Sequence, residues 1–406
     1  MKILVVSHYY TPFTGVGAKK VSSLVNFLSE KGDNLFVLRA SNHQYNLQVL
    51  EEEISPNIEI FNVKDIKSTK SQFLDYILWR ENYKNKIRKI VENEVIELII
   101  FSGGPFFYFS LGEYFLKNHN VKYILDFRDP WIIGSSFHYK KNHNIIYAIK
   151  WFIISILYKY KEKRSVIHAD LVLVPSKEFF TIMRKNYKTI ISNKIHVIMN
   201  GFDDSKLDDI PKTTTKRTLD VMTLGIFGSF SYYSTSYIKN FLLSIKELIN
   251  EGFLIEILHL GKQEQYMQDV MREFGLSNIY HAYGNIEYNK GMKLLSNVNV
   301  LLINDNSIIG HGTKIFDYIY LNKPIVAFVP KQSAIASLLS NFENGYICNS
   351  KNEISRILRN IISNNINYLD FNLDRTEYSR SFQFQILFNQ IHNQLQTHLM
   401  INSITK

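Results

Sequence analysis

Residues 311–328 of this 406-residue chain read His-Gly-Thr-Lys-Ile-Phe-Asp-Tyr-Ile-Tyr-Leu-Asn-Lys-Pro-Ile-Val-Ala-Phe. A small polar loop opens a helical pattern at Thr313, the pattern ends near Asn322, and an apolar strand follows at 325–329. The N-terminus of a helix presents unpaired N–H groups and a partial positive charge, which suit a phosphate group. This stretch therefore predicts a helix with an anion site where it begins, followed by a buried strand.

Several side chains of the same stretch fit a nucleotide. Gly312 lies in the polar loop, and Thr313 and Lys314 can add polar contacts to a diphosphate. Asp317 lies about one turn further on, where its carboxylate can accept the two hydroxyls of a ribose. The segment can thus hold a nucleoside diphosphate by both ends. The alternative is a plain helix N-cap followed by a buried strand.

Short apolar runs alternate with helical patterns on both sides of this stretch. Such runs are typical of strands buried on both faces of a parallel sheet, with helices between them. The predicted strands are 2–7, 34–39, 57–63, 97–101, 121–126, 170–174, 195–198, 220–227, 254–260, 279–283, 298–303 and 324–329. The predicted helices are 18–31, 70–93, 106–118, 144–165, 176–187, 234–250, 263–274, 287–296, 313–321, 333–340, 351–363 and 376–399.

A polar break rich in threonine and lysine at 203–218 interrupts this alternation and indicates a linker. The sequence therefore predicts an α/β protein with two Rossmann-like, doubly wound domains that face each other across a cleft. We expect the first domain at 1–202 and the second at 219–375, and a last helix at 376–406 that crosses back to the first domain. Ligands of such sheets bind at the carboxyl ends of the strands.

Composition and charge narrow the class of protein. Hydrophobic residues make up 46% and charged residues 21%, as in ordinary folded domains, and the single cysteine, Cys348, rules out a disulfide framework. Residues 1–200 contain 28 Lys and Arg against 18 Asp and Glu, whereas 201–406 contain 19 of each. The first domain is thus expected to face something anionic. The aromatic residues follow core patterns, so we expect no nucleic-acid partner.

The segment 138–164 combines lysines and histidines with aromatic and aliphatic residues. Lys150 interrupts its apolar run, which is too short to span a bilayer. The composition fits a helix that lies on an anionic membrane surface, and a largely buried helix with a basic end is the alternative. We expect a cytoplasmic protein, peripheral at the inner face of the cell membrane.

Two motifs in the first half end predicted strands. Gly15 and Gly17 lie between the first strand and the first helix, where glycines let the backbone approach a ligand closely, although a plain connecting loop is the alternative. Asp126 and Asp129, within Asp-Phe-Arg-Asp-Pro-Trp at 126–131, follow an apolar strand. A carboxylate there can act on an acceptor hydroxyl, and an Arg–Asp pair that braces the turn is the alternative.

Further turns end strands at 197–203 and in the second half. A simple glycine turn accounts for Asn200-Gly201. Gly228, followed by Ser229, would let a diphosphate approach the backbone, and Lys262 follows the next strand as a cation that can also be simply solvated. No His and Cys cluster has the spacing of metal ligands, and no P-loop or Gly-x-Ser-x-Gly nucleophile turn is present.

Together these motifs resemble a bacterial glycosyltransferase with two Rossmann domains (GT-B), similar to family 4, over nearly the whole chain. The resemblance rests on Gly15-Val16-Gly17, Asp126 to Trp131, Ala169-Asp170 through Pro175-Ser176, Asn200-Gly201-Phe202-Asp203, Phe227-Gly228, Gly312 to Tyr318 and Lys323-Pro324-Ile325.

The resemblance implies that the second domain binds a UDP- or GDP-linked sugar. Gly312 and Thr313 would lie against the diphosphate with Lys314 nearby, and Asp317 would hold the ribose. The first domain would bind a saccharide acceptor of lipid-linked type, with Gly15 and Gly17 near the reacting centre. Such enzymes usually retain anomeric configuration, need no metal or other cofactor, and often build surface polysaccharide such as lipopolysaccharide or capsule.

The chain also departs from this family. Ile309 replaces an acid often found eight residues before the ribose acid, Ser229 replaces a common arginine, and Asp317 is one methylene shorter than the usual glutamate.

In a transferase of this kind, fixed N–H groups and a cation would stabilise the leaving diphosphate electrostatically. A nucleotide-sugar epimerase, or a catalytically inactive transferase-like partner protein, is the alternative function.

Overall fold

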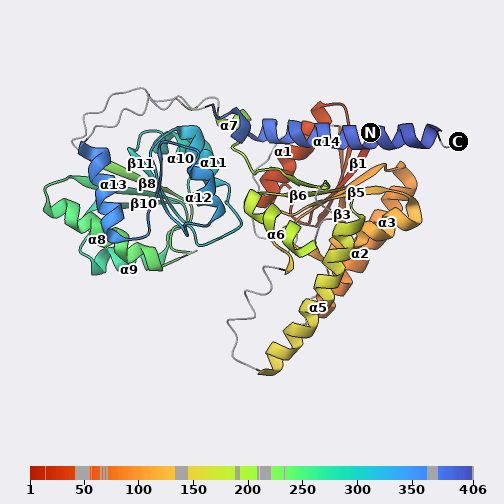
Figure 1. Cartoon of the computed structure of the whole chain (residues 1–406), viewed down its shortest axis with the longest axis horizontal. Helices are drawn as coiled ribbons and strands as arrows, with labels where there is room; N and C mark the ends of the chain where they lie inside the picture. Colours follow the sequence, from red (N-terminus) through yellow and green to blue (C-terminus); the bar gives the residue numbers. More distant parts are fainter. Residues whose placement is uncertain are drawn as a thin grey trace. The chain divides into compact units, whose positions relative to one another are not determined.

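The computed structural model of the chain describes residues 1–13, 15–41, 57–64, 72–132, 145–187, 193–207, 221–232, 234–363 and 374–404, together with positions 55, 66, 69 and 210. The described chain forms two compact units (Figure 1). Unit 1 comprises Met1–Met199 and Phe384–Lys406, and unit 2 comprises Asn200–Gln383. Most of the expected linker at 203–218 lies outside the described residues, as does the first part of the expected membrane segment, 138–144.

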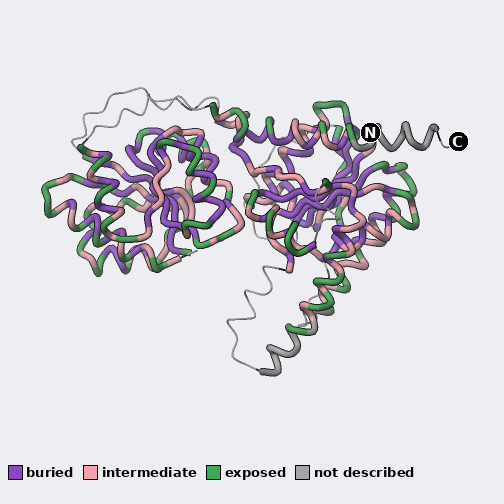
Figure 2. The backbone as a smooth tube through the Cα atoms, viewed as in Figure 1, coloured by how far each residue is buried: buried purple, intermediate pink, exposed green. Residues whose placement is uncertain are grey.

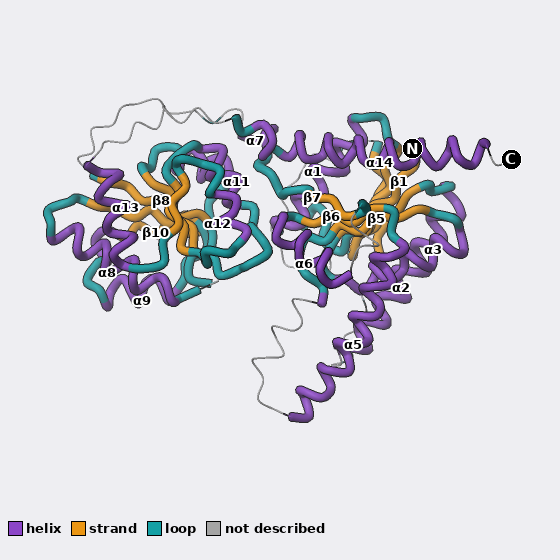
Figure 3. Tube along the Cα trace, viewed as in Figure 1, coloured by secondary structure: helices purple, strands orange, loops and turns teal. Residues whose placement is uncertain are grey.

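Unit 1 contains a seven-stranded parallel sheet in the order β3-β2-β1-β4-β5-β6-β7. The central strands are continuous apolar runs because helices cover both faces of the sheet (Figure 3). Every residue of β4 is buried, for example. The strands are β1 Lys2–Val6, β2 Asn34–Ala40, β3 Ile58–Val63, β4 Leu98–Ser102, β5 Lys122–Asp126, β6 Leu171–Val174 and β7 Ile195–Val197.

The helices of unit 1 lie between these strands, as expected for parallel crossovers. They are α1 Val16–Glu30, α2 Gln72–Glu94, α3 Gly112–His119, α5 Ile145–His168 and α6 Lys177–Tyr187, and α14 Arg380–Ile404 joins them from the end of the chain. No helix of the described residues is both long enough and apolar enough to cross a membrane.

The single helix expected at 106–118 is two elements in the structure. A 3-10 helix, Phe106–Leu111, precedes α3, and Gly112 lies at the junction. A Cβ at Gly112 would lie 2.4 Å from the ring of Tyr123 on β5, so only glycine allows this close approach to the sheet. The apolar periodicity of the two elements runs on without a break, which is why the sequence pattern merges them.

Unit 2 contains a six-stranded parallel sheet in the order β10-β9-β8-β11-β12-β13. Its strands are β8 Met222–Phe227, β9 Ile255–Leu260, β10 Tyr280–Gly284, β11 Val300–Asn304, β12 Ile325–Phe328 and β13 Gly345–Ile347. Its helices are α7 Asp204–Leu207, α8 Ser236–Asn250, α9 Gln265–Glu273, α10 Tyr288–Leu295, α11 Lys314–Leu321, α12 Ala334–Leu339 and α13 Lys351–Ser363. The two sheets confirm the predicted class of two Rossmann-like, doubly wound domains.

The chain passes between the units at 199–200 and again within α14. Phe384, Leu387 and Ile391 on α14 belong to the core of unit 1, where the Phe384 ring lies 5.8 Å from that of Phe27 on α1. The last helix therefore completes the first domain, as Figure 2 shows by the buried residues along the described part of α14.

The two connecting segments are joined to each other inside unit 2. Phe202 and Ser379 form a parallel β-bridge, and the buried Arg380 guanidinium lies 2.7 Å from the Asp203 carboxylate. A Cβ at Gly201, whose φ is +61°, would lie 2.7 Å from the Arg380 nitrogen. A glycine is thus required where the two segments touch.

Candidate functional site

Two glycines shape the turn that ends β8. Gly228 has a φ of +71°, and its N–H donates to the carbonyl of Leu260 at 2.7 Å. Gly261 ends the neighbouring strand β9 with a φ of +141°, and a Cβ there would lie 2.8 Å from the Gly228 Cα. Neither position tolerates a side chain easily, so the backbone at the carboxyl ends of β8 and β9 is bare.

His259 fixes the carbonyl at this turn. Its Nε2 lies 2.7 Å from the Gly228 carbonyl oxygen, and its Nδ1 lies 2.6 Å from the Tyr280 hydroxyl. Burial lowers the pKa of His259. Because a carbonyl only accepts, Nε2 carries the proton, Nδ1 accepts from Tyr280, and the imidazole is neutral.

Helix α11 begins beside this turn. Thr313 is its N-cap residue and makes no side-chain capping bond, and Gly312 is exposed, with nothing within 4 Å of the place where a Cβ would lie. The Lys314 ammonium donates to the carbonyl of Ser229 at 2.8 Å. This bond brings together the two turns that the sequence singled out separately.

Lys314 supplies the cation of the site. The residue is half-exposed, yet burial around its ammonium lowers the pKa to about 8, against the opposing effect of Asp305 and Glu264. Asp305 follows β11, and burial raises its pKa, whereas Lys314 and the N–H of Ser307 act in the other direction. The Lys314 ammonium, at the start of α11, thus interacts electrostatically with two carboxylates, those of Asp305 and Glu264.

Glu264 also shapes the loop after β8. Its Oε2 accepts the N–H groups of Phe230 at 2.8 Å and of Ser231 at 2.9 Å. Asn304, fully buried at the end of β11, donates to the carbonyls of Phe230 at 2.8 Å and of Ser234 at 2.6 Å. The loop that follows Gly228 is therefore held from the end of β11 and from the turn that follows β9.

Asp317 is buried in the first turn of α11 and is 6% exposed. Its Oδ1 accepts a hydrogen bond of 2.7 Å from the hydroxyl of Tyr288, the first residue of α10. Burial and the Asp317 carboxylate both raise the pKa of Tyr288, which therefore stays protonated and donates. A carboxylate held by a neutral donor suits the hydroxyls of a sugar ring.

The remaining residue predicted for the donor is placed differently. Lys262 is exposed after Gly261, and no hydrogen bond or ion pair of its side chain joins it to the other site residues within the described part of the chain. Sequence reasoning missed Asp305, Glu264, His259 and Tyr288. In the sequence, only Asp305 and Glu264 could have been noticed, because each is a charged residue close to the end of a strand.

The residues predicted in unit 1 form a second group at the carboxyl ends of β1, β4 and β5. Gly15 is the N-cap residue of α1, and the Arg128 guanidinium donates to the carbonyl of Gly17. Arg128 also lies 3.9 Å from the buried Asp126, whose Oδ2 accepts 2.6 Å from Ser102. These contacts favour the alternative reading in which Arg128 and Asp126 brace the loops, while Asp129 is exposed.

His8, which follows β1, lies next to this group and was not predicted. Its Nδ1 lies 3.1 Å from the Tyr83 hydroxyl, and burial lowers its pKa to about 4. The rings of Trp79 and Phe107 pack edge-on against it. At neutral pH this imidazole is uncharged.

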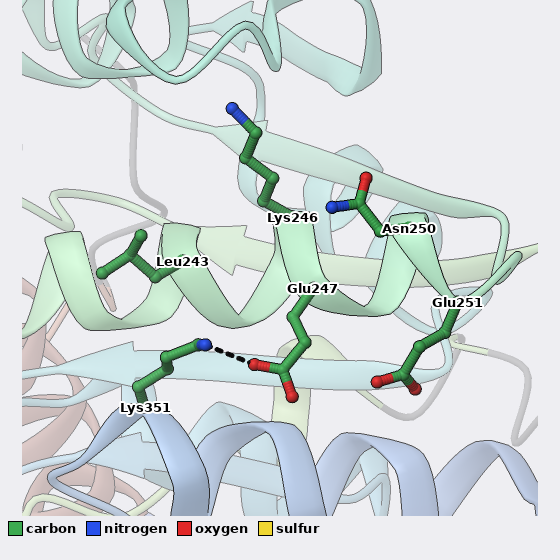
Figure 4. Close-up of a pocket in the computed structure, with 6 residues that line it drawn as sticks. All are labelled: Leu243, Lys246, Glu247, Asn250, Glu251 and Lys351. Carbon is green, nitrogen blue, oxygen red and sulfur yellow. Dashed lines mark ion pairs between the residues drawn. The ribbon is translucent and has the colours of Figure 1, made fainter.

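A surface depression on unit 2 lies between α8 and α13 (Figure 4). Leu243 lines it together with the charged and polar residues Lys246, Glu247, Asn250, Glu251 and Lys351. The Lys351 ammonium pairs with Glu247 at 2.5 Å. The depression contains none of the residues at the turns after β8 and before α11. Among the described residues, no group of three or more His, Cys, Asp and Glu side chains is arranged to hold a metal ion.

Comparison with known proteins establishes the fold. No protein-family description matches the sequence, and no curated protein sequence matches it. Among solved structures, the lipopolysaccharide outer core galactosyltransferase WaaB in its apo form is similar, with a TM-score of 0.65 at 11% identity over 97% of this chain and 99% of that one.

Two further structures are similar over nearly their whole length. Sucrose-phosphate synthase from Thermosynechococcus elongatus has a TM-score of 0.64 at 13% identity, over 100% of this chain and 99% of that one. UDP-GlcNAc 2-epimerase from Neisseria meningitidis bound to UDP-GlcNAc has a TM-score of 0.60 at 12% identity, over 97% and 100%. The predicted GT-B fold of two Rossmann-like domains is thereby confirmed.

Proposed function

We propose that this chain is a glycosyltransferase that moves a sugar from a UDP- or GDP-linked donor to a saccharide acceptor. One observation carries the proposal: the Lys314 ammonium donates to Ser229 at 2.8 Å. This bond places a cation and the N-terminus of α11 beside the bare backbone of Gly228. Transferases and nucleotide-sugar enzymes among the similar structures support the same class of activity.

The chemistry follows from charge. Cleavage of the bond between sugar and diphosphate leaves negative charge on the phosphate oxygens. The N–H groups at the start of α11 and the Lys314 ammonium stabilise that charge without reorganising as it develops. We propose that no metal takes part, that configuration is retained, and that the departing phosphate accepts the proton of the attacking acceptor hydroxyl. The bond from sugar to phosphate breaks as the bond from sugar to acceptor oxygen forms.

An epimerase is the second candidate, because UDP-GlcNAc 2-epimerase has the same fold. Such an enzyme converts its nucleotide sugar without an acceptor. Incubation of the protein with a bound nucleotide sugar alone, followed by NMR of the sugar protons, separates the two. A change of sugar configuration without an acceptor favours the epimerase, whereas transfer only with an acceptor favours the transferase. Binding without turnover under both conditions indicates the inactive partner protein.

The donor site is tested with a thermal-shift panel of UDP-, GDP- and other nucleotide sugars. A ligand at a hundred times its dissociation constant stabilises the fold by about 2.7 kcal/mol. Asp317→Ala, Thr313→Ala and Lys314→Met are expected to weaken that stabilisation. The control is Lys246→Met, which removes a lysine of the same unit from the depression between α8 and α13. Unchanged donor binding in all three variants refutes the site.

We also propose that the chain binds an anionic membrane through residues 138–164 and receives a lipid-linked acceptor there. The described part of α5 has a row of exposed apolar residues, Phe152, Ile156 and Tyr160, at a spacing of four, beside the exposed Lys159 and Lys163. Apolar residues can enter the headgroup region while lysines reach anionic lipid. These features, together with the excess positive charge of the first half of the chain, support peripheral binding to a membrane.

Vesicle sedimentation tests this contact. We expect binding to vesicles with anionic lipid that weakens with salt, and weaker binding after Ile156→Ser combined with Lys163→Ser. A double substitution at exposed residues of unit 2, Leu243→Ser with Lys246→Ser, is the control. Equal binding to neutral vesicles, or binding to neither kind, contradicts the proposal.

A further inference from the structure

Tyr288 is a hydrogen-bond partner of the carboxylate proposed to hold ribose. It begins α10, and its hydroxyl donates to Asp317 Oδ1 at 2.7 Å. The two residues are 29 positions apart and come from separate helices, so this bond depends on the packing of α10 against the strand ends. The Asp317 side chain is one methylene shorter than a glutamate and relies on such a partner for a fixed orientation.

The Tyr288 ring is itself held from the sheet. The ring of Phe227, the last residue of β8, lies 6.0 Å from that of Tyr288. Gly291, one turn into α10, lets Phe227 approach, since a Cβ there would lie 3.2 Å from the Phe227 ring. The N–H of Phe227 donates to the Tyr318 hydroxyl at 2.9 Å, which ties the strand end to α11.

The charges around Tyr288 keep it a donor. Burial and the Asp317 carboxylate raise its pKa, so it carries its proton at every pH at which the protein would work. Arg380 and Asp203 also act on Tyr288 electrostatically, and in opposite directions. A hydrogen bond from a neutral hydroxyl to a charged carboxylate is among the stronger kinds in proteins.

We propose that Tyr288 is a positioning residue that orients the Asp317 carboxylate toward the ribose hydroxyls and so sets the preference for a ribonucleotide over a deoxyribonucleotide. This inference rests on the proposed donor site. It adds a second residue to ribose recognition that does not itself touch the nucleotide. The alternative is that Tyr288 only packs between Phe227 and α11.

The test measures nucleotide selectivity rather than affinity alone. Isothermal titration gives the dissociation constants of UDP and 2′,3′-dideoxy-UDP, or of the guanine pair if the protein binds GDP. They are measured for the wild type, for Tyr288→Phe and for the control Tyr346→Phe. Tyr346 packs beside the core of the same unit on β13, and no hydrogen bond joins its hydroxyl to Asp317 in the described structure.

We expect the wild type and Tyr346→Phe to favour the ribonucleotide at least tenfold, which corresponds to about 1.4 kcal/mol. Tyr288→Phe should lose about tenfold in ribonucleotide affinity and almost nothing for the dideoxy compound, so that the preference disappears. A second variant, Phe227→Leu, weakens the packing but keeps the hydroxyl. It should lower the melting temperature and retain the preference.

Four results overturn the inference. If Tyr288→Phe leaves the preference intact, or weakens the binding of both nucleotides equally, Tyr288 has only a packing role. Tighter ribonucleotide binding by Tyr288→Phe shows that the hydroxyl competes with the ribose instead of assisting it. A wild type that binds neither nucleotide overturns the donor site itself, and the role of Tyr288 with it. That last result can be distinguished from the others because it is observed with the wild type alone.

Discussion

At the scale of single residues, buried ionisable groups control how the protein responds to pH. Lys314 has a pKa of about 8 because burial disfavours its charge. An anion that binds beside it restores the charged form and raises that pKa. Proton binding and diphosphate binding at this residue are therefore linked.

We predict that nucleoside diphosphate affinity is highest below pH 8 and falls about tenfold between pH 8 and 9. The free protein loses the Lys314 proton in that range, and the bound state needs it. Titration calorimetry at pH 7, 8 and 9 measures the change. Lys314→Met should bind more weakly at pH 7 and show little dependence on pH. The same slope in the variant would assign the titration to another group.

Glu162 offers a second prediction, on stability. It is 2% exposed in α5, and burial raises its pKa to about 7, although Tyr187 and the N–H of Ile132 donate to it. The folded state therefore binds more protons than the unfolded state between pH 4.5 and about 7. The contribution of this group to stability is complete below pH 4.5 and is lost as pH rises through 7.

We expect Glu162→Gln to be more stable than the wild type at pH 7.5, by up to about 3 kcal/mol, and equally stable near pH 4.5. Urea unfolding at several pH values measures this difference. The exposed Glu92→Gln in α2 of the same unit is the control and should change neither value. A constant difference between Glu162→Gln and the wild type across pH would contradict the assignment.

At the scale of elements, strands and crossover helices could be predicted from the sequence because both faces of each sheet are covered. Continuous apolar runs such as 98–102 and 300–304 are typical of central strands that are buried on both faces, as these two strands are. The weak element was β13, Gly345–Ile347, which is three residues long and half-exposed. An edge strand this short has no apolar run from which it could be predicted.

The turn between β9 and α9 makes an element-scale prediction. Gly261→Ala forces a Cβ against the Gly228 Cα and displaces the bare turn, so we expect it to weaken donor binding as well as stability. Gly275→Ala is the control, because Gly275 also has a positive φ but nothing lies within 4 Å of its Cβ position. It should cost about 1 kcal/mol and spare binding. Titration calorimetry measures donor binding by both variants, and thermal melts measure their stability.

At the scale of the whole molecule, the sequence singled out the turns after β8 and before α11, but not the other residues that the structure brings to them. Gly228, Ser229 and Lys314 meet because β8 and β11 are neighbours in the sheet and α11 follows β11. Asp305, Glu264 and Tyr288 reach the same place from three separate connections. No local spacing encodes such a gathering, so these residues were missed.

The joined connecting segments of unit 2 give a prediction on overall stability. Arg380→Met leaves the buried Asp203 carboxylate without its closest cation, so we expect a loss of about 3 kcal/mol. Arg359→Met on α13 is the control. Its guanidinium also pairs with acids, Glu247 and Glu251, but these three side chains are 39%, 33% and 38% exposed, so water screens the pairs and the loss should be much smaller than for Arg380→Met. Equal losses in urea unfolding would contradict this distinction.

The placement of α14 has a consequence for biosynthesis. Phe384, Leu387 and Ile391 fill the core of the domain whose strands are translated first, and all of unit 2 is made in between. On the ribosome, the earlier domain must wait with an uncovered apolar face on its sheet while the later one folds. The domain that starts first is finished last, and chaperones that shield nascent chains have that interval in which to act.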